Sequence, residues 1–179
     1  MSADAAKPRT VLGLFERAVS EAPGAPAVVT PEAAVTWAEL DGRARRLAGA
    51  LAAAGIRSGE RIALWLPNGV DWLAAHWAAA RNGNVVVPIS TRLPAQQVRD
   101  RLAHAEAVAL FATAGFEDID LVAALERVLA APPASLRVAV VRGPAGRDAS
   151  GRDAGAALEG RATDWEDFAR RGEGAALPE

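Results

Sequence analysis

The N-terminal part of the chain has apolar residues at helical spacing, followed by two short runs of β-forming residues. From Thr10 to Ala18 apolar positions recur every three or four residues and Pro23 ends the pattern, which predicts an amphipathic helix. The runs 27–30 and 34–36 have the composition of strands and are separated by a proline-containing turn. We therefore expect a helix followed by a small hairpin.

A longer helix is predicted to begin at Thr36. Glu39 lies three residues further on, which is the spacing of a capping box, where the two side chains each satisfy a backbone N–H group. Gly55 marks the expected end of this helix. One face is apolar and consists of Leu40, Ala44, Leu47, Ala48 and Leu51. The charged positions of this helix are expected to face solvent, and they are Asp41, Arg43, Arg45 and Arg46. An alternative role for the three arginines is to bind an anion.

Strand and helix patterns alternate through the middle of the chain. The strand-like runs are 61–66, 85–87, 107–112 and 136–141. Helical runs are expected between them, at 70–81, 94–106 and 118–131. Pro94 suits the first turn of its helix. Such βαβ units predict a parallel sheet layered with helices on both faces, so the expected fold class is α/β.

The composition changes after Val141. The segment 142–179 contains seven glycines and few large apolar residues, so it cannot bury a core of its own. Trp165 and Phe168 lie three residues apart, which predicts a short helix that docks one apolar edge on the rest of the protein. A loop is expected at 143–160. We therefore divide the chain into a flexible N-terminus, an α/β subdomain and a loop-rich tail, at 1–9, 10–141 and 142–179.

Charge and composition exclude several classes of function. The formal net charge is −2, so the chain has no broad positive field of the kind that nucleic-acid-binding proteins use. The absence of cysteine removes thiol nucleophiles, disulfides and zinc–cysteine sites, and fits a reducing compartment. No apolar run is long enough to span a membrane, and residues 1–9 hold no signal-peptide core. These features predict a soluble, cytoplasmic protein.

The chain offers few candidate catalytic groups. His76 and His104 match no metal-ligand spacing, and both are expected to be structural or surface residues of helices. Trp65, Trp72 and Trp77 have rings that can stack on a ligand, but they are expected to pack in the core. We expect no metal site.

Acidic and glycine-rich segments add no catalytic site. A group of acids is expected in the first turn of the helix at 118–131, where the helix dipole stabilises them: Glu117, Asp118 and Asp120. The segments Gly143–Gly146 and Gly151–Gly155 lead into no regular helix, whereas a phosphate-binding loop feeds a helix N-terminus. The only lysine is Lys7, so no internal lysine is available to neutralise a phosphoryl group. ATP chemistry by these residues alone is therefore not expected.

Four segments carry family motifs in a fixed order. The first is Val35–Leu40 (VTWAEL), at the start of the long helix. Arg61–Asn68 (RIALWLPN) is followed by Asp71–Trp72, and Ala78–Ile89 (AAARNGNVVVPI) completes the series. Together they resemble the N-terminal portion of the adenylate-forming (AMP-dependent) acyl-CoA synthetase family. The resemblance extends over about 10–141 and implies the N-terminal α/β subdomain of that fold.

The resemblance implies an enzyme that uses ATP and Mg²⁺ to convert a carboxylic acid to an acyl-adenylate and then transfers the acyl group to CoA. The family's phosphate loop, [ST]-S-G-T-T-G-x-P-K-G, and its catalytic lysine are absent from these residues, so this chain alone is expected to be inactive and to hold no cofactor. One residue carries over. Arg92, in Ser90–Leu93 (STRL), matches an arginine that in some CoA ligases of the family contacts the CoA nucleotide phosphate. A guanidinium suits that anion, and the alternative is that Arg92 only pairs near the following helix.

Three interpretations of the chain remain open. The segment Val86–Ser90 (VVPIS) favours acid–CoA ligases over amino-acid-activating domains, and the missing C-terminal half then completes the enzyme in cis. Alternatively, the chain is a non-catalytic scaffold subunit of a split adenylating enzyme, with the other half in trans. The third interpretation is a Rossmann-type nucleotide-binding module, although no G-x-G-x-x-G motif follows any predicted strand. Without its second half the protein is expected to expose an apolar face and to self-associate, for example as a homodimer.

Overall fold

A parallel sheet forms the centre of the computed structural model, which describes residues 10–31, 34–116, 119–143 and 158–175. Its strand order is β4-β3-β5-β8-β9, and every neighbouring pair is parallel. The strands are β3 (Arg61–Trp65), β4 (Val85–Pro88), β5 (Ala109–Thr113), β8 (Val138–Arg142) and β9 (Thr163–Asp164). This arrangement confirms the predicted α/β fold class.

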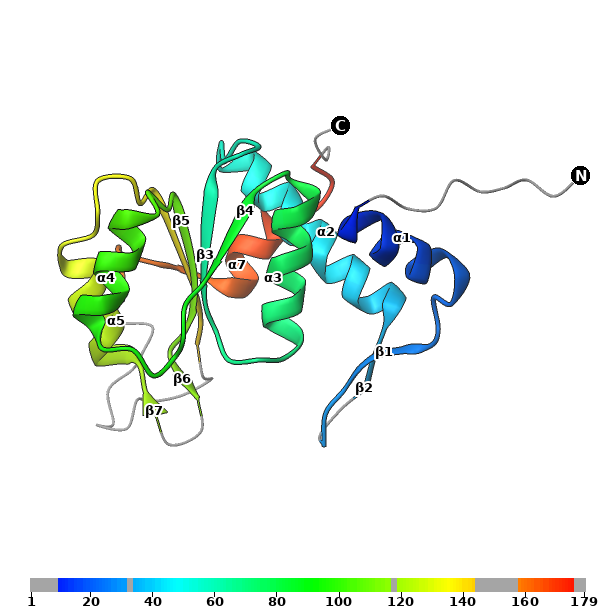
Figure 1. The fold of residues 1–179 in the computed structure, drawn as a ribbon, viewed down its shortest axis with the longest axis horizontal. Coiled ribbons are helices and arrows are strands. Elements are labelled where there is room, and N and C mark those ends of the chain that lie inside the picture. The colour runs from blue at the N-terminus through cyan, green and yellow to red at the C-terminus, as the bar shows by residue number, and fades with distance from the viewer. Residues whose placement is uncertain (1–9, 32–33, 117–118, 144–157, 176–179) are drawn as a thin grey trace, which may run out of the picture.

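Helices cover both faces of the sheet (Figure 1). One face carries α2 (Trp37–Ala53), α3 (Val70–Arg81) and α7 (Trp165–Arg170), and the other carries α4 (Ala95–His104) and α5 (Val122–Ala130). The reason lies in the alternation of side chains along a strand. In β3, Ile62 and Leu64 enter the first apolar cluster, whereas Ala63 and Trp65 enter the second. Because both faces are apolar, both need a layer of helices.

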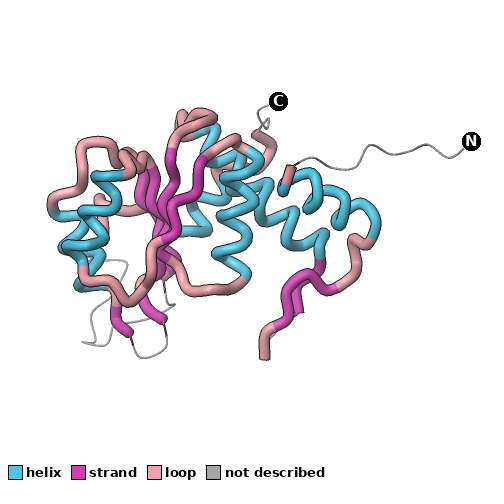
Figure 2. The backbone as a smooth tube through the Cα atoms, viewed as in Figure 1, coloured by secondary structure: helices cyan, strands magenta, loops and turns pink. Residues whose placement is uncertain are grey.

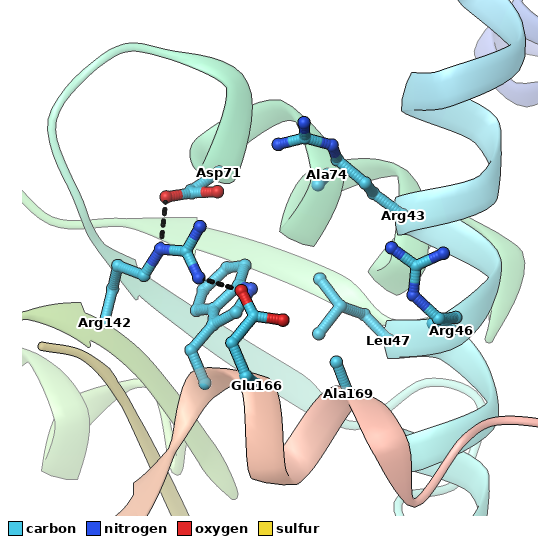
Figure 3. Close-up of a pocket in the computed structure, with 9 residues that line it drawn as sticks. Arg43, Arg46, Leu47, Asp71, Ala74, Arg142, Glu166 and Ala169 are labelled. Carbon is cyan, nitrogen blue, oxygen red and sulfur yellow. Dashed lines mark hydrogen bonds and ion pairs between the residues drawn. The ribbon is translucent and has the colours of Figure 1, made fainter.

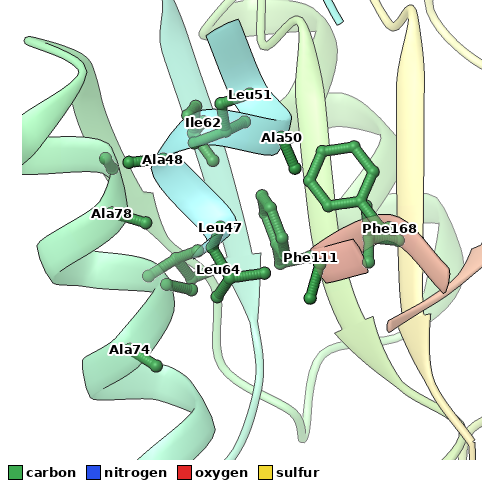
Figure 4. Close-up of a cluster of buried hydrophobic side chains, with 14 of the residues drawn as sticks. Leu47, Ala48, Ala50, Leu51, Ile62, Leu64, Ala74, Ala78, Phe111 and Phe168 are labelled. Carbon is green, nitrogen blue, oxygen red and sulfur yellow. The ribbon is translucent and has the colours of Figure 1, made fainter. Parts of the chain in front are cut away.

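The predicted docking of the C-terminal segment is confirmed. Phe168 and Trp165, both buried, place their rings edge-on against Phe111 of β5, with centroid distances of 5.7 and 5.5 Å. Figure 4 shows Phe168 entering the cluster formed by α2 and the sheet. Asp164 begins α7 as its N-cap, since its side chain accepts hydrogen bonds from the backbone N–H groups of Glu166 and Asp167. The tail thus completes the core that it cannot build by itself.

The N-terminal elements also match the sequence pattern. Helix α1 (Val11–Glu21) packs through Phe15, whose ring stacks on Trp77 at a centroid distance of 4.3 Å. Strands β1 (Pro26–Val29) and β2 (Ala34–Thr36) pair antiparallel and form the predicted hairpin, which Figure 2 shows leading into α2. The capping box is present. The Thr36 N–H group donates to Glu39 Oε2 at 2.8 Å, and the Glu39 N–H group donates to Thr36 Oγ1 at 3.2 Å.

Two expected helix starts are wrong. Helix α5 begins at Val122, because Ile119–Asp120 instead forms β7, antiparallel to β6 (Gly115–Phe116). The Leu121 N–H group donates to the Ala114 carbonyl and closes this small hairpin, so Asp120 does not lie in a helical first turn. Glu117 and Asp118 lie outside the described residues. Pro94 is the extended N-cap of α4 rather than part of its first turn.

Large apolar side chains remain exposed at two ends of the described molecule. Val11, Leu14 and Val29, on α1 and β1, are each more than half exposed. Val85 is also exposed and belongs to β4, which is an edge strand of the sheet. Four exposed side chains do not make up a continuous apolar face, so the expected face for the second half of the enzyme, and the expected self-association, stay predictions. Within the described residues, no helix is both long and apolar enough to cross a membrane.

Candidate functional site

A cavity of about 240 Å³ lies where the carboxyl ends of β3, β8 and β9 meet the helices. Open α/β sheets bind their ligands at this end of the strands. We call it the arginine cavity. Its lining residues come from α2, α3, α7 and the end of β8: Arg43, Arg46, Leu47, Asp71, Ala74, Arg142, Trp165, Glu166 and Ala169. Figure 3 shows Arg43 and Arg46 on the α2 side, with Arg142 and two carboxylates across the cavity.

Arg142 is held in place on one wall of the arginine cavity. Its Nε donates to Asp71 Oδ2 at 3.0 Å, its Nη1 donates to Glu166 Oε1, and its guanidinium lies over the Trp165 ring. Burial opposes the positive charge, but the hydrogen bond to Glu166 and the charge of Asp71 outweigh it, so the pKa of Arg142 is raised. Arg142 is therefore a fixed cation.

The opposite wall carries two arginines from neighbouring turns of α2. Arg43 and Arg46 are three residues apart, so both side chains lie on the same side of the helix. Among the described residues neither forms an ion pair of the kind that holds Arg142. Arg45 points away from the cavity and its Nε donates to Asp41 Oδ2 at 2.6 Å. Only two of the three arginines predicted to share a solvated face therefore reach the cavity.

The expectation that Asp41 faces solvent is wrong. The Asp41 carboxylate is buried and pairs with Arg81 of α3 as well as with Arg45. Arg81, whose side chain is 6% exposed, also donates to Glu16 of α1 at 2.8 Å. Burying the charged groups of Asp41 and Arg81 costs desolvation free energy, and their ion pair offsets that cost. This network joins α1, α2 and α3 and has a structural role.

Arg92 lies apart from the arginine cavity, in an exposed turn that follows β4. The turn is closed by the Leu93 N–H group, which donates to the Ser90 carbonyl at 3.2 Å. Trp65 Nε1 donates to the same carbonyl at 3.1 Å, so a buried ring fixes the loop that presents Arg92. The Arg92 N–H group also donates to Ser90 Oγ. Arg92 is accessible from solvent on a loop of defined shape.

The tryptophans and histidines considered as candidate site residues pack in the fold or lie on its surface, away from the arginine cavity. Trp65 is buried, and Trp72 and Trp77 pack against the α2–α3 core, as predicted. His76 stacks on Trp72 with a centroid distance of 5.2 Å, and burial lowers the pKa of His76. His104 is an exposed residue at the end of α4, across the sheet from His76.

No metal-binding group of three or more acidic, histidine or cysteine side chains is present among the described residues. The glycine-rich segments expected to be poor phosphate loops lie mostly in 144–157, outside the described residues. Arg142 and Glu166 line the cavity, but nothing in the sequence indicates this, because both follow Val141 in the segment without a core of its own. The sequence signal for the cavity is the three-residue spacing of Arg43 and Arg46, which puts two cations on one face of a helix.

Comparison with known proteins agrees with this architecture. A family model described as "AMP-binding enzyme" matches residues 15–169. A "3-[(3aS,4S,7aS)-7a-methyl-1,5-dioxo-octahydro-1H-inden-4-yl]propanoyl:CoA ligase" of Mycobacterium tuberculosis is 35% identical over 119 residues, which cover 66% of this chain and 24% of that protein. A feruloyl-CoA synthase of an Amycolatopsis species is 39% identical over 119 residues, covering 65% of this chain and 24% of that protein.

The fold has close counterparts among solved structures. The acetoacetyl-CoA synthetase of Streptomyces lividans superposes with a TM-score of 0.75 and 28% identity, covering 94% of this chain and 25% of that one. The chain thus spans about a quarter of the length of these relatives. The family model extends from α1 to α7 and includes the sheet, the arginine cavity and the Arg92 loop. The resemblance to adenylate-forming acyl-CoA synthetases is therefore confirmed, and the chain belongs to the AMP-binding enzyme family.

Proposed function

We propose that this chain is the N-terminal part of an ATP-dependent acid–CoA ligase. The complete enzyme activates a carboxylic acid as an acyl-adenylate, with release of pyrophosphate, and then forms a thioester with CoA. The observation that carries this proposal is the family match over residues 15–169, together with relatives that are named as CoA ligases. The order of the motifs from Val35 to Ile89 supports it.

The residues of this chain fit some of the implied ligands and not others. The sequence has no glycine-rich loop that ends in lysine, and no metal-binding cluster occurs among the described residues, so ATP and Mg²⁺ are assigned to the remainder of the enzyme. CoA is the implied ligand that this chain's residues do suit, through Arg92. It is exposed, its loop is fixed by Trp65, and a guanidinium binds phosphate in a bidentate manner. We assign Arg92 to the nucleotide phosphate of CoA.

The remainder of the ligase is proposed to join this chain either in cis or in trans. An intact mass of the protein from its native cell, with identification of any co-purified chain, separates the two arrangements. The same preparation should catalyse acid-dependent exchange of pyrophosphate into ATP when it is supplied with a panel of carboxylic acids. The 179-residue chain alone should not.

Two results would overturn the proposal. One is pyrophosphate exchange by the 179-residue chain on its own, because that would place the ATP site within these residues. The other is the absence of exchange with every acid by a native preparation that contains a family phosphate loop and is folded by circular dichroism.

A further inference from the structure

We propose that the arginine cavity binds a phosphate-type oxyanion between Arg43 and Arg46 of α2, facing Arg142. The inference rests on the geometry of the cavity and does not depend on the ligase activity. The relevant residues lie on α2, at the start of α3, at the end of β8 and at the start of α7, which the fold brings together.

The balance of charge around the cavity favours an anion. Three guanidinium groups line it against two carboxylates, those of Asp71 and Glu166, and both carboxylates are paired with Arg142. On the opposite wall, Arg43 interacts electrostatically with Glu39, but within the described residues neither Arg43 nor Arg46 forms an ion pair like those of Arg142. Like charges that face one shared space repel each other, and an anion between them removes that repulsion.

The chemistry of the lining suits a phosphate. A phosphate monoester carries about −1.5 to −2 charges at pH 7, which balances the charge of two guanidinium groups. Arginine forms paired N–H···O bonds with phosphate oxygens, and Arg142 is fixed by its carboxylates so that it adds a preorganised positive charge on the far side. Leu47, Ala74 and Ala169 also line the cavity, but its surface is mainly polar, as a site for an anion requires.

The size of the cavity limits the ligand. Sites for drug-sized molecules typically enclose about 300–1,000 Å³, whereas this cavity encloses about 240 Å³. It therefore suits one phosphoryl group, either free or as the end of a larger ligand that extends into solvent, and not an entire nucleotide.

The test is a calorimetric titration of the 179-residue chain with inorganic phosphate at low ionic strength, with chloride at equal ionic strength as the reference. We expect saturable phosphate binding with one site per chain. Arg43→Gln and Arg46→Gln should each weaken the binding at least tenfold. Arg45→Gln is the matched control, because it removes the same charge from the same helix but from a side chain that points to Asp41.

Circular dichroism and thermal unfolding of each variant establish that the fold is retained. AMP and pyrophosphate, titrated in parallel, identify the source of the phosphoryl group. If they compete with phosphate and lose affinity in Arg46→Gln, the site accepts the phosphate of a larger ligand; if they do not compete, it accepts the free ion. The proposal is wrong if phosphate binds no better than chloride, or if Arg45→Gln weakens binding as much as the two cavity variants do. Neither outcome bears on adenylation, which is measured separately.

Discussion

Gly172 lies directly against the backbone of Arg46, so closely that a Cβ atom on Gly172 would be 1.9 Å from the Arg46 carbonyl oxygen. The approach is mutual, because a Cβ atom on Gly49 would be 2.6 Å from the Gly172 carbonyl oxygen. The turn that follows α7 therefore reaches α2 only because both positions lack a side chain. This contact fixes the tail, and with it Glu166 and Trp165, next to the helix that carries Arg43 and Arg46.

We predict that Gly172→Ala destabilises the protein. The added methyl group must push the tail away from α2, and overpacking of this kind costs about 1–3 kcal/mol of unfolding free energy. Urea denaturation followed by circular dichroism measures the change. The control is Gly24→Ala, where a Cβ atom would meet nothing within 4 Å, and its effect should stay within about 0.5 kcal/mol. Equal stability of wild type and Gly172→Ala would show that the tail does not pack as described.

The pair formed by Arg81 and Asp41 should be the most sensitive charged contact of the helical layer. Arg81→Ala leaves the Asp41 carboxylate buried with only Arg45 as a partner, and breaking a buried pair costs about 3–5 kcal/mol. We expect a loss near the lower end of that range. For comparison, Arg17→Ala breaks a pair with Glu21 in which both side chains are more than half exposed. That change should cost less than about 1 kcal/mol, and equal losses in the two variants would contradict this assignment.

His76 predicts a dependence of stability on pH. Because burial lowers its pKa, the folded state holds His76 neutral at pH values where the unfolded chain, with a pKa near 6.5, takes up a proton. The unfolding free energy is therefore expected to fall as the pH drops below about 6.5. It should fall less in His76→Phe, which keeps an aromatic ring against Trp72 but cannot titrate. An NMR titration of the His76 imidazole with a midpoint at or above 6.5 would disprove the explanation.

The assignment of Arg92 is tested in the complete ligase. Arg92→Gln removes a charged hydrogen-bond donor to the CoA phosphate, and such bonds are worth about 1.5–3 kcal/mol, so KM for CoA should rise at least tenfold. The adenylation half-reaction, measured by pyrophosphate exchange, should remain unchanged. Arg101→Gln, an exposed arginine on α4, serves as the charge control. If Arg92→Gln leaves the dependence on CoA unaltered, Arg92 only supports its own loop.

The errors of sequence analysis share a physical cause. The acids before Leu121 favour an early start for the helix at 118–131, but Asp120 instead pairs with Gly115 in the hairpin of β6 and β7. The sequence predicts that Asp41 faces solvent, because a charged residue outside the apolar face of its helix is normally exposed. Its partner Arg81 lies 40 residues further along the chain and meets it only after α2 and α3 have packed. Contacts between distant residues override local preference in both cases.

Sequence patterns are enough to identify the α/β class, the helix that begins at the Thr36–Glu39 capping box, the core strands and the family of the chain. The fold class, the helix start and the strands follow from the period of apolar side chains and from local backbone hydrogen bonding, which neighbouring residues decide. The family follows from the resemblance of the ordered motifs between Val35 and Ile89. Three relationships are visible only in the folded protein: the tail joins the sheet edge at β9, Gly172 contacts Arg46, and Arg43, Arg46 and Arg142 surround one cavity. The most distant pair in these relationships, Arg46 and Gly172, is 126 positions apart in the sequence. The relationships arise only when the apolar faces of α2, α3 and α7 are buried on the same side of the sheet.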